Sequence, residues 1–153
     1  QIGMGALKYF ILKVDPKKNM TFNPRESIDF NGNTGPFIQY SYARIKSVLR
    51  KANDTPVHLS KEFALDEKEV CLVKTIYEFK QVIENSAKEL NPSLIANYLF
   101  DLAKEYNQFY HDHPILKADS EDQKQSRLFI SSICAEVINR GMFLLGIEVP
   151  ERM

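Results

Sequence analysis

The sequence contains no tryptophan, only two cysteines in 153 residues, and no long apolar run. Two cysteines cannot build the disulfide framework of a small secreted protein, so Cys71 and Cys134 are predicted to pack as small hydrophobic side chains in a reducing compartment. The apolar runs at residues 9–12 and 142–145 are far shorter than the roughly 18 residues of a membrane span. No signal peptide is visible either. We therefore expect a cytoplasmic chain that does not enter a membrane.

What the chain does contain is typical of one globular domain. Hydrophobic residues make up 44% and charged residues 26%, which excludes disordered and fibrous classes. The length suffices for a single domain with its own core. The first residue is Gln1 and not Met, which suggests a piece of a longer chain.

The net charge of zero hides an uneven distribution. Residues 1–53 carry nine Lys or Arg against three acids, a net charge of +6, and the remaining residues carry −6. One interpretation is that only the first third of the chain faces an anionic partner. The other is that the two parts attract each other across the fold. Charge alone does not decide between them.

Apolar residues recur at helical spacing along most of the chain, and no segment alternates convincingly as a strand would. The spacing predicts helices over residues 2–14, 36–51, 65–90, 92–110 and 121–145, with a short one after Asn23. The segment 65–90 is long enough that we expect a bend or break near residues 79–84. Short connections imply antiparallel neighbours. The predicted fold class is all-α, an antiparallel helical bundle of five to six helices.

Four local signals mark where these helices begin and end. Asn23 and Asn91 each precede a proline, the combination of a capping residue with proline at the first helical position. Ser120 and Gln123 have the spacing of a capping box. Gly146, followed by an isoleucine, predicts a Schellman stop for the last helix.

No convincing catalytic constellation is present. The sequence lacks a Gly-rich phosphate loop, a nucleophile elbow, and the C-x-x-C and H-E-x-x-H motifs. His111, Asp112 and His113 form the only cluster of ligand-type residues, and a metal site needs more ligands in fixed geometry. We interpret residues 111–119 as a solvated loop and expect no metal site.

The segment 36–51 is the most informative helix because it contains no acid and divides into two faces. The face predicted to lie in the core carries Ile38, Tyr42, Ile45 and Leu49. The nearly opposite face carries Phe37, Tyr40, Arg44 and Lys51. Aromatic rings and cations on one face suit single-stranded nucleic acid, whose bases stack and whose phosphates attract cations. Periodicity alone favours the alternative, a second packing surface that also includes Val48.

Four segments resemble the arginyl-tRNA synthetase family. Residues 32–45, GNTGPFIQYSYARI, resemble that family's segment GNTGPYLQYAHARI. Residues 2–9, IGMGALKY, resemble the helix that follows its catalytic core. YLFDLA at residues 98–103 and NQFY at 107–110 resemble its YL-x-x-LA and N-x-FY helix, and LGIEVPERM at 145–153 resembles its C-terminus. The matches follow the family's order from one end of the chain to the other.

The resemblance implies the α-helical anticodon-binding domain of the DALR type over residues 36–153. Residues 1–35 would be the C-terminal end of the catalytic domain and a connector. The implied partners are the tRNA(Arg) anticodon loop and an upstream catalytic domain of the same chain, a class I ligase that joins arginine to tRNA with ATP. The family's ATP-site signatures, HIGH and KMSK, do not occur in these residues. We therefore expect a monomeric, non-catalytic piece that holds no cofactor.

The resemblance also implies which residues contact the anticodon loop. Phe37 and Tyr40 match positions at which the family presents aromatic rings to bases. Tyr110 matches the aromatic residue of the N-x-FY motif, and Met153 matches a terminal residue near the same pocket. The tail that carries Met153 is predicted to be anchored by Ile147 and Val149, the alternative being a disordered end.

Two further residues have open roles. Arg44 matches the family's helix arginine, which either contacts RNA or braces the bundle. Asn107 either bonds a base edge or makes a structural hydrogen bond. A different function also fits these residues, a helical protein–protein interaction module in which Phe37 and Tyr40 anchor a partner helix.

Overall fold

The computed structural model describes residues 1–52 and 65–153, and the regular secondary structure within these ranges consists of helices alone. The helices are α1 (Ile2–Leu12), α2 (Pro24–Ser27), α3 (Gly35–Lys51), α4 (Glu67–Glu89), α5 (Ser93–Asp112) and α6 (Glu121–Leu144). None of them is long and apolar enough to cross a bilayer. The predicted all-α class is confirmed.

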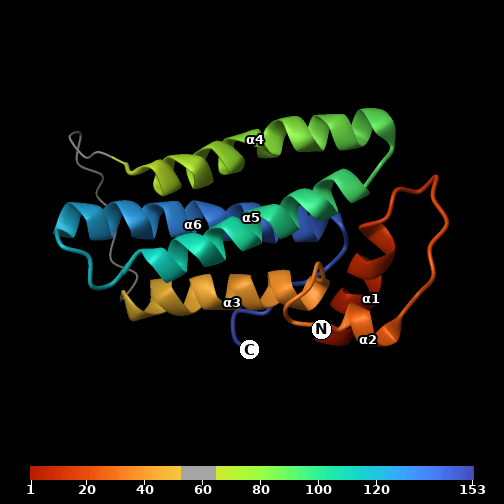
Figure 1. Cartoon of the computed structure of the whole chain (residues 1–153), viewed down its shortest axis with the longest axis horizontal. Helices are drawn as coiled ribbons and strands as arrows, with labels where there is room; N and C mark the ends of the chain where they lie inside the picture. Colours follow the sequence, from red (N-terminus) through yellow and green to blue (C-terminus); the bar gives the residue numbers. More distant parts are fainter. Residues whose placement is uncertain (53–64) are drawn as a thin grey trace.

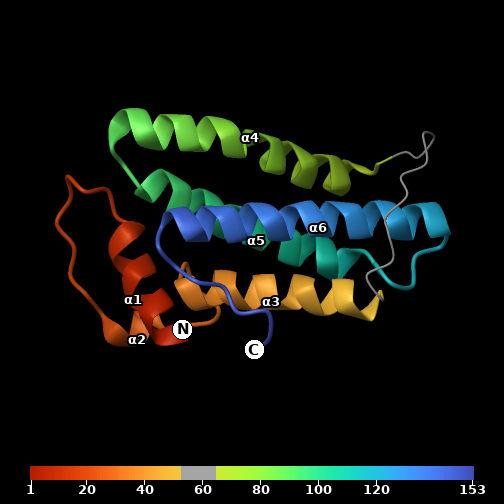
Figure 2. The ribbon, with the colours of Figure 1, turned by 180° about the vertical axis from the view of Figure 1, so that it is seen from behind.

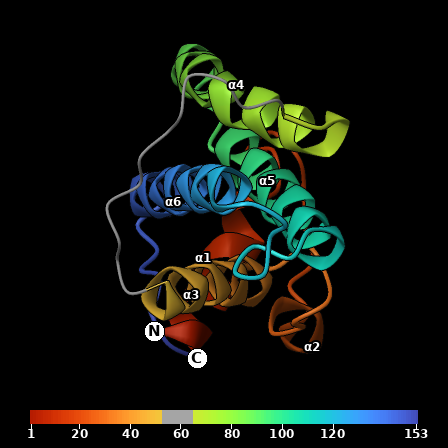
Figure 3. The ribbon, with the colours of Figure 1, turned by 90° about the vertical axis from the view of Figure 1, so that its left-hand side faces the viewer.

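The long helices form a bundle with a smaller α1–α2 unit at one end (Figure 1). Seen from its end, the bundle has α3 on one side, α5 and α6 in the middle, and α4 on the other side (Figure 3). Helices α4, α5 and α6 follow one another in alternating directions, and α4 packs mainly on α5 (Figure 1). The bundle is therefore antiparallel, as the short connections predict.

The core is built from the apolar stripes that the spacing predicts. In α3, Ile38, Tyr42 and Ile45 are buried, and Leu49 packs partly buried against the same cluster. Helix α5, predicted from apolar residues at helical spacing, buries five of them, namely Ile95, Leu99, Leu102, Tyr106 and Phe109. Each stripe faces the bundle because residues three and four apart share one side of a helix.

Three of the four predicted helix ends are present, whereas α5 begins at Ser93 with Pro92, and not Asn91, at its N-cap position. The Asn23 side chain accepts a bond from the Arg25 amide at 3.1 Å, and Ser120 accepts one from Gln123 at 3.2 Å. At the end of α6, Gly146 adopts φ +67° and the Ile147 amide donates to the Met142 carbonyl at 2.9 Å. These features define a Schellman stop.

Three local predictions are wrong or incomplete. The predicted break is absent, since helix α4 is continuous from Glu67 to Glu89, and Phe79 at that point stacks on Tyr98 of α5 with 5.6 Å between ring centroids. A bend near residues 79–84 stays a prediction. Helix α5 continues to Asp112, so the loop begins later than predicted. Cys71 is exposed, since it lies about 100° around α4 from the buried Leu72, whereas Cys134 is buried as expected. Helix α3 ends at Lys51 as predicted, with Ala52 as its C-cap, and the residues 53–56 that follow lie outside the described residues.

Helix α1 approaches α3 closely where two glycines meet. A Cβ atom on Gly35 would lie 2.6 Å from the carbonyl oxygen of Gly5. Nearby, Tyr9 is fully buried, and its hydroxyl lies 2.6 Å from Asn33 Oδ1 and 2.8 Å from the Ala96 carbonyl oxygen. Residues from α1 thus share the core of the bundle. The predicted domain boundary at residue 35 stays a prediction.

We expect Gly35→Ala to lower the free energy of unfolding by about 1–3 kcal/mol, because the new methyl group meets backbone that cannot move aside. Gly3→Ala is the matched control: no atom lies within 4 Å of a Cβ there, so stability should stay equal or rise by up to about 1 kcal/mol. Urea denaturation measures both. Equal stability of the two variants would contradict the close approach of α1 and α3.

Candidate functional site

A pocket of about 850 Å³ opens between α3, the end of α5 and the C-terminal tail. Three elements that are distant in sequence therefore contribute to one site. Its lining includes Tyr40, Arg44 and Lys51 from α3, Tyr110 and His111 from α5, Lys117 from the following loop, and Arg152 and Met153 from the tail. The pocket brings together four of the six predicted site residues.

The centre of the site is Arg44, which lies between two tyrosine rings. Its guanidinium carbon is 4.9 Å from the ring centroid of Tyr40 and 5.4 Å from that of Tyr110. Cation–π attraction stabilises this arrangement. The two tyrosines remain 42% and 40% exposed, so their rings are available to a ligand.

Asn107 sits behind this group and orients it. Its Oδ1 accepts a bond from Arg44 Nη1 at 2.6 Å, and its Nδ2 donates to Ser41 Oγ at 2.8 Å. The structural hydrogen bond is thus present, made to α3 and not to a loop. An amide still has one further donor and acceptor position, so a base contact stays a prediction.

Phe37 lies apart from the pocket. Its ring packs against Phe100, with centroids 5.3 Å apart, and it lies partly buried against the core. Val48 is also buried, so this part of α3 is the second packing surface, whereas Tyr40 is open. The packing alternative therefore holds for Phe37 and Val48, and an RNA contact by Phe37 or Tyr40 stays a prediction.

Phe30 extends the aromatic surface and was not singled out by the sequence reasoning. It is 45% exposed, and its ring meets Tyr40 edge-on at 6.4 Å between centroids. The only available signal was its position directly before the segment 31–45. Nothing in the local spacing predicts that the connection from α2 to α3 returns to Tyr40.

The pocket has a positive lining. Its described residues include five cations, Arg44, Arg50, Lys51, Lys117 and Arg152, together with His111 and His113, and no acid. Lys117 and Arg152 come from the acidic part of the sequence. The expectation that only the first third faces an anion is therefore incomplete, because folding brings cations from both parts to one place.

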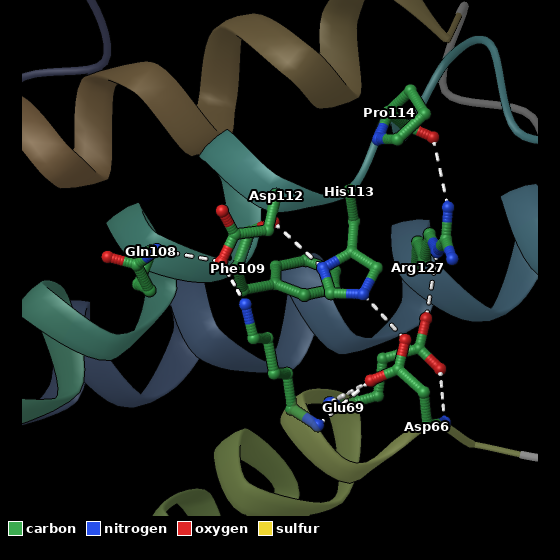
Figure 4. Close-up of polar contacts among 9 residues, drawn as sticks. Asp66, Glu69, Gln108, Phe109, Asp112, His113, Pro114 and Arg127 are labelled. Carbon is green, nitrogen blue, oxygen red and sulfur yellow. Dashed lines mark hydrogen bonds and ion pairs between the residues drawn. The ribbon is translucent and has the colours of Figure 1, made fainter.

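Figure 4 shows Asp112 and His113 of the cluster at residues 111–113 together with their partners. His111 and Asp112 belong to the last turn of α5. The His113 side chain is only 12% exposed, with Nε2 2.5 Å from Asp66 Oδ2 and Nδ1 3.2 Å from the Phe109 carbonyl oxygen. His113 is therefore not a solvated loop residue as predicted.

A buried ion pair lies beside this histidine. Arg127 Nε donates to Glu69 Oε1 at 2.8 Å, and its Nη1 donates to the Pro114 carbonyl at 3.2 Å. Glu69 Oε2 also accepts the Asp66 amide at 3.0 Å, completing the cap of α4. Figure 4 shows these contacts joining the start of α4, the end of α5 and α6.

Asp66, Glu69 and His113 are the one group of metal-ligand type within the described residues, with ligand atoms within 4.8 Å of one another. Each of these atoms already has a protein partner, and Arg127 supplies the positive charge. A metal ion would have to displace His113 from Asp66 and Arg127 from Glu69. The geometry therefore favours a network of hydrogen bonds among Asp66, Glu69, His113 and Arg127, here called the clamp, over a metal centre. The sequence could not reveal the clamp, because its partners lie 47 and 58 residues apart.

The carboxyl of Asp66 is sensitive to this environment. Desolvation raises its pKa, but hydrogen bonds from the Glu69 and Lys68 amides and from His113 outweigh this and hold the pKa below its usual value. Because the folded pKa lies below the unfolded value of about 4, the charged form stabilises the fold above that pH. The stabilisation is lost as the pH falls through the folded pKa.

We expect Asp66→Asn, which keeps a capping side chain, to lower the free energy of unfolding at pH 7. The difference from the unchanged protein should shrink as the pH is lowered from 7 to 3, because the stabilisation by the charged form begins to be lost once the pH falls below the unfolded pKa of about 4. Urea denaturation of both proteins at several pH values between 7 and 3 measures this difference in the free energy of unfolding. Asp119→Asn, at an exposed loop position, should show little difference at either pH. A constant gap for Asp66→Asn would show that its charge does not stabilise the fold.

Comparison with known proteins identifies the family. Residues 38–153 match the family model described as the DALR anticodon binding domain. The arginine–tRNA ligases of Parabacteroides distasonis and Bacteroides fragilis are 56% and 58% identical over 156 residues, which cover 99% of this chain and 26% of each relative. The chain thus spans about a quarter of the length of the curated relatives it matches.

Solved structures agree with this match. The arginyl-tRNA synthetase of Thermus thermophilus superimposes with a TM-score of 0.88 at 31% identity, over 99% of this chain and 26% of that one. The enzyme of Plasmodium falciparum superimposes with a TM-score of 0.83 at 27% identity, over 97% of this chain and 26% of that one. From the family match over most of its length, we conclude that the chain belongs to the DALR anticodon binding domain family.

Proposed function

We propose that this chain binds the anticodon loop of tRNA(Arg). The observation that carries the proposal is the group formed by Arg44, Tyr40 and Tyr110 over a pocket with five cations and no lining acid. Unpaired bases of an RNA loop stack on exposed aromatic rings, and phosphates interact with cations. The proposal fits the family match and the names of the relatives, which are arginine–tRNA ligases.

The pocket suits a splayed base in size and chemistry. Its volume of about 850 Å³ is within the range of small-molecule sites. In this proposal Tyr40 and Tyr110 stack on bases, and Arg44 stays between them as a brace that also attracts phosphate. Met153 closes the tail side of the pocket with a polarizable side chain.

The names of the relatives support a proposal for the wider role of the domain. We propose that it positions tRNA for arginylation by an upstream catalytic domain of the same protein, which uses ATP, while this part holds no cofactor. Helix α1 offers a surface for that domain, because Met4, Leu7 and Ile11 are exposed on it, with Phe22 nearby. Apolar side chains gathered on one face indicate a covered surface. We propose a cytoplasmic monomer.

Replacing Tyr40 tests the site most directly. Tyr40→Ala should weaken binding of the matching tRNA by about 1–3 kcal/mol, the value of one base–aromatic stack. Tyr77→Ala is the matched control, since Tyr77 is 86% exposed on α4 and lies outside the pocket. Fluorescence anisotropy with a labelled anticodon stem-loop measures both.

The thermal midpoint completes this test. A variant Tyr40→Ala that melts early but keeps full RNA affinity would show that Tyr40 packs and does not stack on a base. Equal affinity losses for Tyr40→Ala and Tyr77→Ala would place binding elsewhere on the molecule.

Salt dependence separates RNA binding from the protein–protein alternative. If the pocket cations contact phosphates, the affinity should fall by about tenfold or more as the salt concentration rises from 50 to 200 mM, because binding releases counterions. A helix held in an apolar groove would respond little. Affinity for the stem-loop that is unchanged over this range would contradict the phosphate contacts.

A further inference from the structure

The C-terminal tail lies across α3 and is held by one stripe of that helix (Figure 2). Gln39, Lys46 and Arg50 lie on the same face, since their spacings of seven and four residues both return to one side of a helix. This face differs from the pocket face of Tyr40 and from the core face of Ile38. Helix α3 therefore has a third face, which contacts the C-terminal tail.

Each member of the stripe contacts the tail. Gln39 Nε2 donates to the Glu148 carbonyl at 2.7 Å. Lys46 Nζ lies 3.1 Å from Glu151 Oε1, and Arg50 Nη1 donates to the Glu151 carbonyl at 3.0 Å. The tail backbone is thus bonded at two carbonyls three residues apart, Glu148 and Glu151. Their donors, Gln39 and Arg50, follow in the same order along α3. Such contacts fix the register of the tail and bring Arg152 and Met153 to the pocket.

Gln39 is the most informative of the three donors. It is fully buried, and its Oε1 has no hydrogen-bond partner. An unpaired buried acceptor is unfavourable, and an apolar side chain of similar size would avoid it. The polar contact that this amide makes is its donation to the tail.

We propose that Gln39 and Lys46 are positioning residues that set the register of the tail and thereby place Met153 against the RNA pocket. The proposal rests on the proposed RNA binding of that pocket. Neither residue lines the pocket, so neither needs to touch RNA itself. Arg50 both lines the pocket and bonds the tail, so it cannot separate the two roles.

A double-mutant cycle tests this proposal. Gln39→Leu and Lys46→Gln are each made in the full chain and in a chain that ends at Pro150, and the Kd of an anticodon stem-loop is measured at one salt concentration. In the full chain each substitution should weaken binding about fivefold, the equivalent of one hydrogen bond. In the shortened chain it should have no effect, because no tail end remains to be placed.

Two controls address charge and geometry. Lys46→Arg keeps a donor for Glu151 and should restore affinity. Lys104→Gln removes one exposed charge from α5, away from the tail, and should change affinity by less than twofold. Losses that persist in the shortened chain would overturn the proposal, because they would mean direct RNA contact or a damaged fold.

Backbone NMR relaxation provides a readout that does not depend on RNA. The amides of Arg152 and Met153 should be ordered in the unchanged protein and mobile in Gln39→Leu, with the thermal midpoint unchanged. Tail order that survives both substitutions would overturn the positioning role. If the unchanged chain fails to bind the stem-loop, the proposed function fails, while the relaxation data still decide how the tail is held.

Discussion

The backbone contact between Gly5 and Gly35 is the constraint on which the site depends. It allows α1 to lie directly against the start of α3, and the Gln39 side chain then fills the space beside Gly5, where an added Cβ would lie 2.6 Å from Nε2. Held there, the Gln39 amide reaches Glu148 and secures the tail. A contact at one end of the bundle thus determines what lines the pocket further along α3.

Helix α3 serves three neighbours because a helix of 3.6 residues per turn can carry three separate stripes. Ile38 and Ile45 face the core, Gln39 and Lys46 hold the tail, and Tyr40 belongs to the pocket. This division explains why the helix combines a buried apolar stripe with a polar and basic composition. Each cation on it either has a partner or faces the pocket.

Sequence reasoning predicted what depends on local spacing. The stripes containing Ile38 and Leu102 and the stop at Gly146 follow from helical periodicity and turn chemistry, and they are present in the structure. The pairing of Glu69 with Arg127 depends on tertiary packing across 58 residues, which no local pattern encodes. The difference between a packed Phe37 and an open Tyr40 likewise depends on where Phe100 lies.

The buried pair of Glu69 and Arg127 has a consequence for how the molecule opens. Separating the start of α4 from α6 would break this buried ion pair and its hydrogen bond. The pair therefore opposes fraying of the first turn of α4. Arg127 also bonds Pro114, which lines the pocket. The rim of the pocket is thereby tied to the bundle, and we expect its amide hydrogens to exchange more slowly than those of an unattached loop.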